Sequence, residues 1–216
     1  MEPTIYKPGA YKTLGVYKGT DGIYNGRGVY NDGTGEFVEI GGRSYPVVTI
    51  GSEKWIAENL DFKFNGLNIG GIIDETTNPS AWYYNNDEIT YGENGKKYGL
   101  LYNHGAIEQL QNFLPTGWRV PTLTDIQNLA NNSADVLKSK SEWISINGTN
   151  ETGFNAFPSG CVVDRVFQDL GYYFNLWSDA TASSYQHYEL YIYNNSVSIG
   201  PAKSVFAFSA RICKDA

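Results

Sequence analysis

The chain has 216 residues, of which 41% are hydrophobic and only 18% are charged, and its formal net charge is −7 at pH 7. This hydrophobic content is enough for a packed core, and the length fits one large domain or one domain with a short appendage. Lys and Arg form no cluster, which argues against a nucleic-acid partner. No stretch approaches the roughly 20 apolar residues of a membrane helix, so we expect no membrane insertion.

Aromatic residues make up 15% of the chain, and 17 of them are tyrosines. Tyrosine contributes contact area at low entropic cost and keeps a polar tip, so it suits both β-strands and recognition surfaces. The first 15 residues lack a positive segment followed by an apolar run, and we therefore expect no secretory signal in this chain.

Residues 1–35 carry a repeated unit of glycine, a β-branched residue, tyrosine and a turn, at 15–19, 22–26 and 28–33. Such units form short strands between tight turns; a flexible glycine-rich linker is the alternative. Because strands this short bury little by themselves, we predict that residues 1–35 form a separate β appendage. It would pack on the main domain or on another copy of the chain, as an oligomerisation segment.

The main domain is predicted to span 36–216 and to open with a hairpin of two strands, 37–40 and 45–50. Residues 65–98 are rich in Gly, Asn, Asp and Tyr without steady periodicity. They predict a long loop region, and loops of this length are usually functional or disordered.

Two helices are predicted in the middle of the chain. Apolar residues with helical spacing run over 107–114, and Pro115 ends that run. The second helix begins after Thr122, a favourable N-cap, with Asp125 three residues later as a capping-box variant. From Phe154 onward the chain reads as strands and turns. This order of elements predicts an α+β fold with a mostly antiparallel sheet.

Residues for metal binding or catalysis are sparse. Neither His104 nor His187 has a His or Cys at ligand spacing, so no zinc centre is predicted. Calcium stays open because Asp, Glu and Asn abound, although there is no EF-hand spacing and no Asp-rich loop. Cys161 and Cys213 allow either one disulfide or two buried thiols. Without a nucleophile elbow or a phosphate loop, we predict no catalytic residues and no enzyme.

Tyr, Asn and Ser concentrate in residues 172–205. Within this segment, alternation places Leu190 and Ile192 on one face of a strand and Tyr191 and Tyr193 on the other. Antibody paratopes use the same mixture of rigid Tyr and adaptable Ser and Asn. A tyrosine layer that only shields an exposed sheet is the alternative. The predicted ligand-binding residues are Tyr172, Tyr173, Asn175, Asp179, Tyr185, His187, Tyr188, Tyr191, Tyr193, Asn194 and Asn195.

Several short motifs occur in one order along about 170 residues. They are Val48-Thr49-Ile50-Gly51 with Trp55-Ile56-Ala57-Glu58-Asn59-Leu60, Tyr98-Gly99-Leu100-Leu101-Tyr102, Pro115-Thr116-Gly117-Trp118-Arg119-Val120-Pro121-Thr122, Gly153-Phe154-Asn155-Ala156-Phe157-Pro158-Ser159-Gly160, Leu176-Trp177-Ser178 and Phe208-Ser209-Ala210-Arg211-Ile212-Cys213. In this combination the chain resembles the Fibrobacter succinogenes major paralogous domain family, a branch of the C-type-lectin-like and formylglycine-generating-enzyme-like superfamily.

The resemblance implies a C-type-lectin-like fold with two helices, small antiparallel sheets and long loops. It also implies a non-catalytic module on a cell surface, in the extracellular space or on a virion tail, with a protein or glycan receptor as partner. The similar variable proteins of diversity-generating retroelements carry their mutable residues just before the final motif. Adenine-directed mutagenesis of Asn codons there yields the residue types of 172–205, and the glycine-tyrosine repeat suits a phage tail or fibre protein.

Departures from the relatives narrow these implications. The calcium motifs of lectins are missing, and the cysteine pair that binds copper in formylglycine-generating enzymes does not appear. We therefore predict a ligand-binding protein with a retroelement-diversified face and no cofactor. The alternatives are an adhesion module with a fixed ligand, and a copper-dependent oxidase that uses Cys161 or Cys213.

Overall fold

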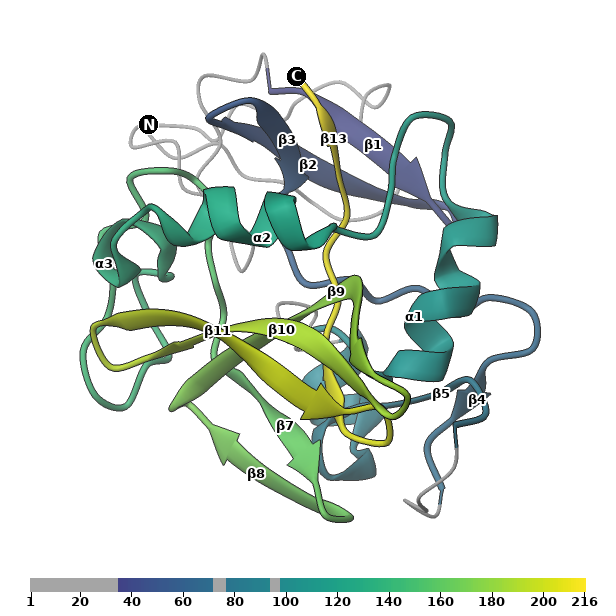
Figure 1. Cartoon of the computed structure of the whole chain (residues 1–216). Coiled ribbons are helices and arrows are strands. Elements are labelled where there is room, and N and C mark those ends of the chain that lie inside the picture. Colours follow the sequence, from purple (N-terminus) through teal and green to yellow (C-terminus); the bar gives the residue numbers. More distant parts are fainter. Residues whose placement is uncertain (1–34, 72–76, 94–97) are drawn as a thin grey trace, which may run out of the picture.

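The computed structural model describes residues 35–71, 77–93 and 98–216. Within them the chain folds into two sheets with short helices at their sides (Figure 1). The smaller sheet has the order β1-β2-β3-β13, formed by Phe37–Ile40, Arg43–Ile50, Glu53–Ile56 and Cys213–Asp215. The predicted appendage 1–35 and its role in assembly fall outside the described residues, apart from Gly35.

The larger sheet has nine strands and holds the Tyr-rich segment. Its main path runs β11-β10-β9-β12-β6-β5-β4, formed by Ser196–Lys203, Gln186–Tyr193, Tyr173–Ser183, Ala207–Ser209, Leu101–Asn103, Ser80–Trp82 and Asn68–Ile69. A hairpin of β7 (Ser159–Val163) and β8 (Val166–Leu170) joins this path through β12. Pairing is antiparallel except between β9 and β12 and between β4 and β5.

Both predicted helices form. Helix α1 (His104–Leu110) begins after Asn103, whose side chain accepts a hydrogen bond from the Ala106 amide at 3.0 Å. Helix α2 (Leu123–Ala130) begins after Thr122, where the predicted capping box with Asp125 is present. The remaining helical segments are a single α-turn, α3 (Ala134–Leu137), two 3₁₀ turns at Tyr84–Asn86 and Gln111–Phe113, and a π-helical turn at Ile89–Glu93.

The predicted α+β class, and with it the lectin-like fold of two helices and small sheets, is wrong. Strands take 41% of the described residues and helices 17%, so the fold is dominated by sheet. The physical reason is the length of three strands: β9, β10 and β11 pair along most of their extent, while the longest helix has only eight residues. In the described part of the predicted loop region 65–98, two short strands, β4 and β5, a 3₁₀ turn and a π-helical turn lie between irregular segments.

Five aromatic residues from the sequence motifs are buried. All of them are at most 6% exposed: Trp55, Trp118, Phe154, Trp177 and Phe208. They divide between two adjoining clusters. One packs Trp118, Trp177 and Phe208 around α1, and the other packs Trp55 and Phe154 around α2 and the inner face of β9 and β10. Helix α2 lies between the smaller sheet and the strands β9 to β11 (Figure 1).

Replacing Phe154 by Ala should lower the free energy of unfolding by about 3–5 kcal/mol, because it opens a cavity in a fully buried site. The Phe154 ring packs edge-on against Trp55 at 5.7 Å and Phe174 at 5.8 Å. Urea denaturation followed by tryptophan fluorescence measures the change. Ile146→Ala, at an exposed position, is the control and should stay within about 0.5 kcal/mol of the parent. Equal small losses in both variants would contradict the assigned core.

Candidate functional site

The candidate site lies on the meander of β9, β10 and β11. Backbone pairing sets Tyr193 opposite Tyr173, and Tyr191 opposite Asn175. Leu190 and Ile192 point to the other side and are fully buried, as alternation predicts. Leu190 and Ile192 therefore hold one side of the meander in the core, and Tyr191 and Tyr193 lie on its outer side.

Three tyrosines gather at one end of this outer side, and we call them the tyrosine face: Tyr173, Tyr191 and Tyr193. The rings of Tyr173 and Tyr193 stack with centroids 4.4 Å apart and planes 11° apart. Tyr191 lies 6.5 Å from Tyr173, measured between ring centroids. Tyr193 is 38% exposed, and Tyr172, which was also predicted to bind ligand, is 42% exposed in the turn before β9. Rings held by paired strands and by each other lose little freedom when a ligand binds.

The turn between β10 and β11 extends the tyrosine face with two exposed amides, Asn194 and Asn195. Asn194 has φ of 52°, a left-handed conformation that Asn tolerates better than most residues. Its carbonyl accepts a hydrogen bond of 3.0 Å from the ammonium group of Lys138, a buried side chain whose charge lies 4.7 Å from the Trp143 ring centre. Lys138 thus fixes the turn from below. Sequence reasoning missed it, because nothing near Lys138 in the sequence marks it as buried.

A buried polar pair lies next to the tyrosine face on the same side of the sheet. Asn175, predicted to be exposed, is buried and donates a 2.8 Å hydrogen bond to the carboxyl group of Glu189. The Glu189 side chain as a whole is half-buried, but burial of its carboxyl group raises the pKa to about 8. Glu189 is therefore mainly protonated at neutral pH, and sequence reasoning did not single it out.

Four other predicted residues lie away from the tyrosine face. Tyr185 is exposed in the turn at the opposite end of β9 and β10, and Tyr188 packs toward the core beside α2. Asp179 is exposed farther along β9. His187 is buried, because its ring stacks on His104 at the start of α1. A β-bulge on either side of His187 breaks the simple alternation that the prediction assumed.

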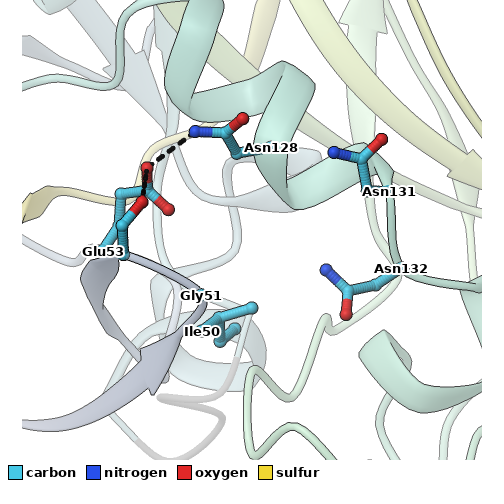
Figure 2. A pocket seen from close by; sticks show the side chains of 7 residues that line it. Ile50, Gly51, Glu53, Asn128, Asn131 and Asn132 are labelled. Carbon is cyan, nitrogen blue, oxygen red and sulfur yellow. Dashed lines mark hydrogen bonds between the residues drawn. The ribbon is translucent and has the colours of Figure 1, made fainter.

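A separate polar pocket of about 350 Å³ lies between the β2–β3 turn and α2. Figure 2 shows Glu53 and Asn128 joined by a hydrogen bond at one side, of 2.8 Å, with Asn132 across the hollow from Ile50. The Glu53 carboxylate also accepts a hydrogen bond from the Ser52 hydroxyl group. The side chains of Glu53, Asn128 and Ser52 already bind one another, and the Asn132 amide donates to the Leu129 carbonyl, so the pocket offers a ligand fewer unpaired groups than its composition suggests.

The two cysteines are buried free thiols, which settles the alternative left open by the sequence. Cys161 lies on β7 and Cys213 on β13, and they belong to different clusters of the core. Burial raises the pKa of both thiols. A buried thiol with a raised pKa holds little thiolate at neutral pH and is a weak nucleophile.

One group of side chains in the described ranges brings three possible metal ligands close together. His104, Glu108 and His187 each present a ligand atom, and these atoms lie within 4.8 Å of one another. The two histidines are far apart in the sequence, so a search for ligands at short spacing does not find them. Burial and the neighbouring His187 lower the pKa of His104 to about 4, which keeps that imidazole neutral.

Together these features define a sheet-dominated domain with short capped helices and an aromatic outer face at one end of its largest sheet. The chain belongs to the family of the Fibrobacter succinogenes major domain, whose model matches residues 48–214, from β2 to β13. Comparison with curated proteins and with solved structures found no match. No helix in the described residues is both long and apolar enough to cross a membrane.

The Glu189 carboxyl group should make stability depend on pH. In the unfolded chain it ionises near pH 4.5, and in the folded protein near pH 8. Between these values the folded state holds the extra proton, so the free energy of unfolding should fall as pH rises, by at most about 1.4 kcal/mol per pH unit. The contribution is complete below pH 4.5 and lost above pH 8.

Glu189→Gln keeps a hydrogen-bond acceptor for Asn175 and cannot ionise, so it should remove this part of the pH dependence. Urea denaturation of both proteins at pH 5, 6, 7 and 8 measures the difference. Glu39→Gln, at an exposed position of β1, is the matched control and should follow the parent. Parallel curves for the parent and Glu189→Gln would show that Glu189 titrates normally.

Proposed function

We propose that this protein is a non-catalytic ligand-binding protein that recognises a protein or glycan receptor through the tyrosine face. The observation that carries the proposal is the stacked pair of Tyr173 and Tyr193 on the paired strands β9 and β10. Aromatic side chains that are exposed and already ordered are the residues that dominate recognition surfaces.

Polar groups around the tyrosine face support the same proposal. Ser196 and Ser198 extend from β11 beside it, and their hydroxyl groups lie 3.2 Å apart. Asn194 and Asn195 add exposed amides at the turn. Amide and hydroxyl groups at the rim of an aromatic surface supply directional hydrogen bonds, which suits a sugar or a peptide backbone equally well.

We further propose that the face is diversified by a retroelement and that the protein acts on a virion tail or a cell surface. The tyrosine face suits substitution, because its side chains lie opposite the buried row of Leu190 and Ile192. Such a face accepts new residues at little cost to the core. Asn175 and His187 are buried and would be expected to vary less.

Diversification predicts a specific arrangement in the flanking DNA. A near-copy of the codons for 172–213 should lie close by, next to a reverse-transcriptase gene, and should differ mainly at adenines. Sequencing the locus tests this. A locus without such a copy would leave a binding protein with a fixed ligand, the adhesion alternative.

The oxidase alternative gains no support from the thiols. Cys161 and Cys213 are buried in different clusters of the core, and burial raises the pKa of both thiols. Copper chemistry at cysteine needs accessible thiolates. Stoichiometric uptake of copper with loss of thiol labelling would reverse this assignment.

Binding should depend on the rings of the tyrosine face and hardly on those elsewhere. Tyr193→Ala and Tyr173→Ala should each weaken binding by about 2 kcal/mol, roughly 30-fold, because each removes half of the stacked pair. Binding of labelled full-length protein to a glycan array, and to a panel of intact bacteria by flow cytometry, measures the effect. Melting curves on the same samples should differ little from the parent.

Tyr185→Ala is the matched control, since Tyr185 is 68% exposed but lies at the opposite end of the β9–β10 hairpin. It should bind as the parent does. Tyr173 and Tyr193 variants that lose stability together, without a specific loss of binding, would show that these rings only shield the sheet.

A further inference from the structure

The fold brings the chain's only two histidines into contact at the end of the sheet away from the tyrosine face. His104 is the first residue of α1, and its backbone amide donates to the Ser204 carbonyl at 3.0 Å. His187 lies on β10 between two bulges, and the rings stack with centroids 3.2 Å apart and planes 12° apart. Bulges of this kind redirect a side chain at functional positions.

The hydrogen bonds of His104 decide which of its ring nitrogens has a free lone pair. Nε2 lies 3.1 Å from the carbonyl oxygen of Ser178. A carbonyl only accepts, so Nε2 carries the proton and Nδ1 is left with its lone pair. A backbone carbonyl that fixes the tautomer in this way is the usual outer partner of a metal-binding imidazole.

Both imidazoles leave an Nδ1 atom without a hydrogen bond in the part of the chain that the structure describes. The Nδ1 atoms of His104 and His187 are buried and make none. Buried polar atoms are nearly always paired, so two orphans side by side require an explanation. Neutral aromatic rings also prefer an offset or edge-on arrangement to a face-to-face stack, so packing alone does not account for the pair.

Glu108 supplies the negative charge beside them. It lies one turn after His104 on α1, and one of its carboxylate oxygens is 3.5 Å from Nδ1 of His104. Its side chain is 60% exposed and therefore free to adjust. A tetrahedral zinc ion with bonds of about 2.0–2.1 Å holds its ligand atoms about 3.4 Å apart. The three ligand atoms already lie within 4.8 Å of one another, and binding requires the two nearly parallel rings to tilt until both Nδ1 lone pairs point at the ion.

The surroundings leave room for a fourth ligand. A hollow of about 100 Å³ is lined by His104, Glu108, Gln111 and Asp179. The amide of Gln111 is engaged by the backbone at Trp118 and Val120, so it is not free to coordinate. Asp179 is exposed at the rim of this hollow, and water can occupy the open position.

We propose that His104, Glu108 and His187 form a binding site for a divalent transition metal of the Zn²⁺ class. Two imidazole nitrogens and one carboxylate are the ligand set of zinc sites with an open position, and imidazole suits Zn²⁺, Co²⁺ and Ni²⁺ better than Ca²⁺. The ion would tie α1 to β10. This inference rests on the histidine pair and is independent of the function proposed for the tyrosine face.

Metal titration of the full chain, purified without a histidine tag and freed of metal with EDTA, tests the proposal. Zn²⁺ alone, followed by calorimetry, should bind saturably with one equivalent, and melting temperature should rise with Zn²⁺ concentration. With Co²⁺, the visible spectrum should show nitrogen and oxygen ligands. Since the chain has two histidines, NMR of their ring nitrogens should show both Nδ1 signals shift.

Two variants locate the site. Glu108→Gln alters an exposed side chain and should weaken Zn²⁺ binding at least about tenfold. His187→Phe keeps a stacked ring and should abolish binding; if it does not fold, Glu108→Gln still decides. Glu39→Gln, an exposed carboxylate elsewhere, is the control and should bind as the parent does. Failure of the parent to bind saturably, binding that is unchanged in Glu108→Gln, or a thiolate-to-cobalt band would each overturn the proposal.

Discussion

The guanidinium group of Arg211 is the interaction on which the rest of the structure depends. Its nitrogens donate to the side-chain oxygen of Asn59 at 2.8 and 3.1 Å, and to the carbonyls of Ile56, Phe154 and Asn155. Its charge also lies 4.2 Å from the Phe154 ring centre. Burial lowers its pKa to about 9, because moving the charged group out of water is unfavourable. Five donors in a fixed plane allow one side chain to satisfy segments that are distant in the sequence.

Arg211 also lies where the two sheets meet. The last segment of the chain passes from β12 in the larger sheet to β13 in the smaller one, and Arg211 stands between them. The carbonyls of its neighbours Ala210 and Ile212 accept backbone hydrogen bonds from Leu60 and Ile56. The segment between β12 and β13 therefore joins the two sheets, and the Arg211 guanidinium group fills the space between them. Arg211 and its partners Asn59, Phe154 and Asn155 thus have a structural role, while the tyrosine face lies on the outer side of the larger sheet.

The two sides of the meander of β9, β10 and β11 have different roles. Its inner side is held by the core around α2, and its outer side carries rings that contact mainly each other. The same outer side holds Glu189 and Asn175 in the middle and His187 beneath α1. One sheet surface therefore presents an aromatic end to solvent and a polar, buried end to the fold. A ligand at one end and a metal ion at the other would both stiffen the strands between them.

Local interactions let the sequence by itself determine the presence of two helices, the capping box of α2, the strands from Phe154 onward, and the burial of Leu190 and Ile192 with tyrosine on the opposite side of their strand. Periodicity of two, turn residues and capping side chains act within a few residues, so a pattern in the chain is enough to predict them. Only the tertiary structure decided the balance of sheet over helix, which of the predicted polar residues stay exposed, and the meeting of His104 with His187. It also decided that Lys138 supports the turn at Asn194. In each case the final arrangement depends on which distant segment packs on a given face. The spacing of neighbouring residues does not reveal the energy of that packing.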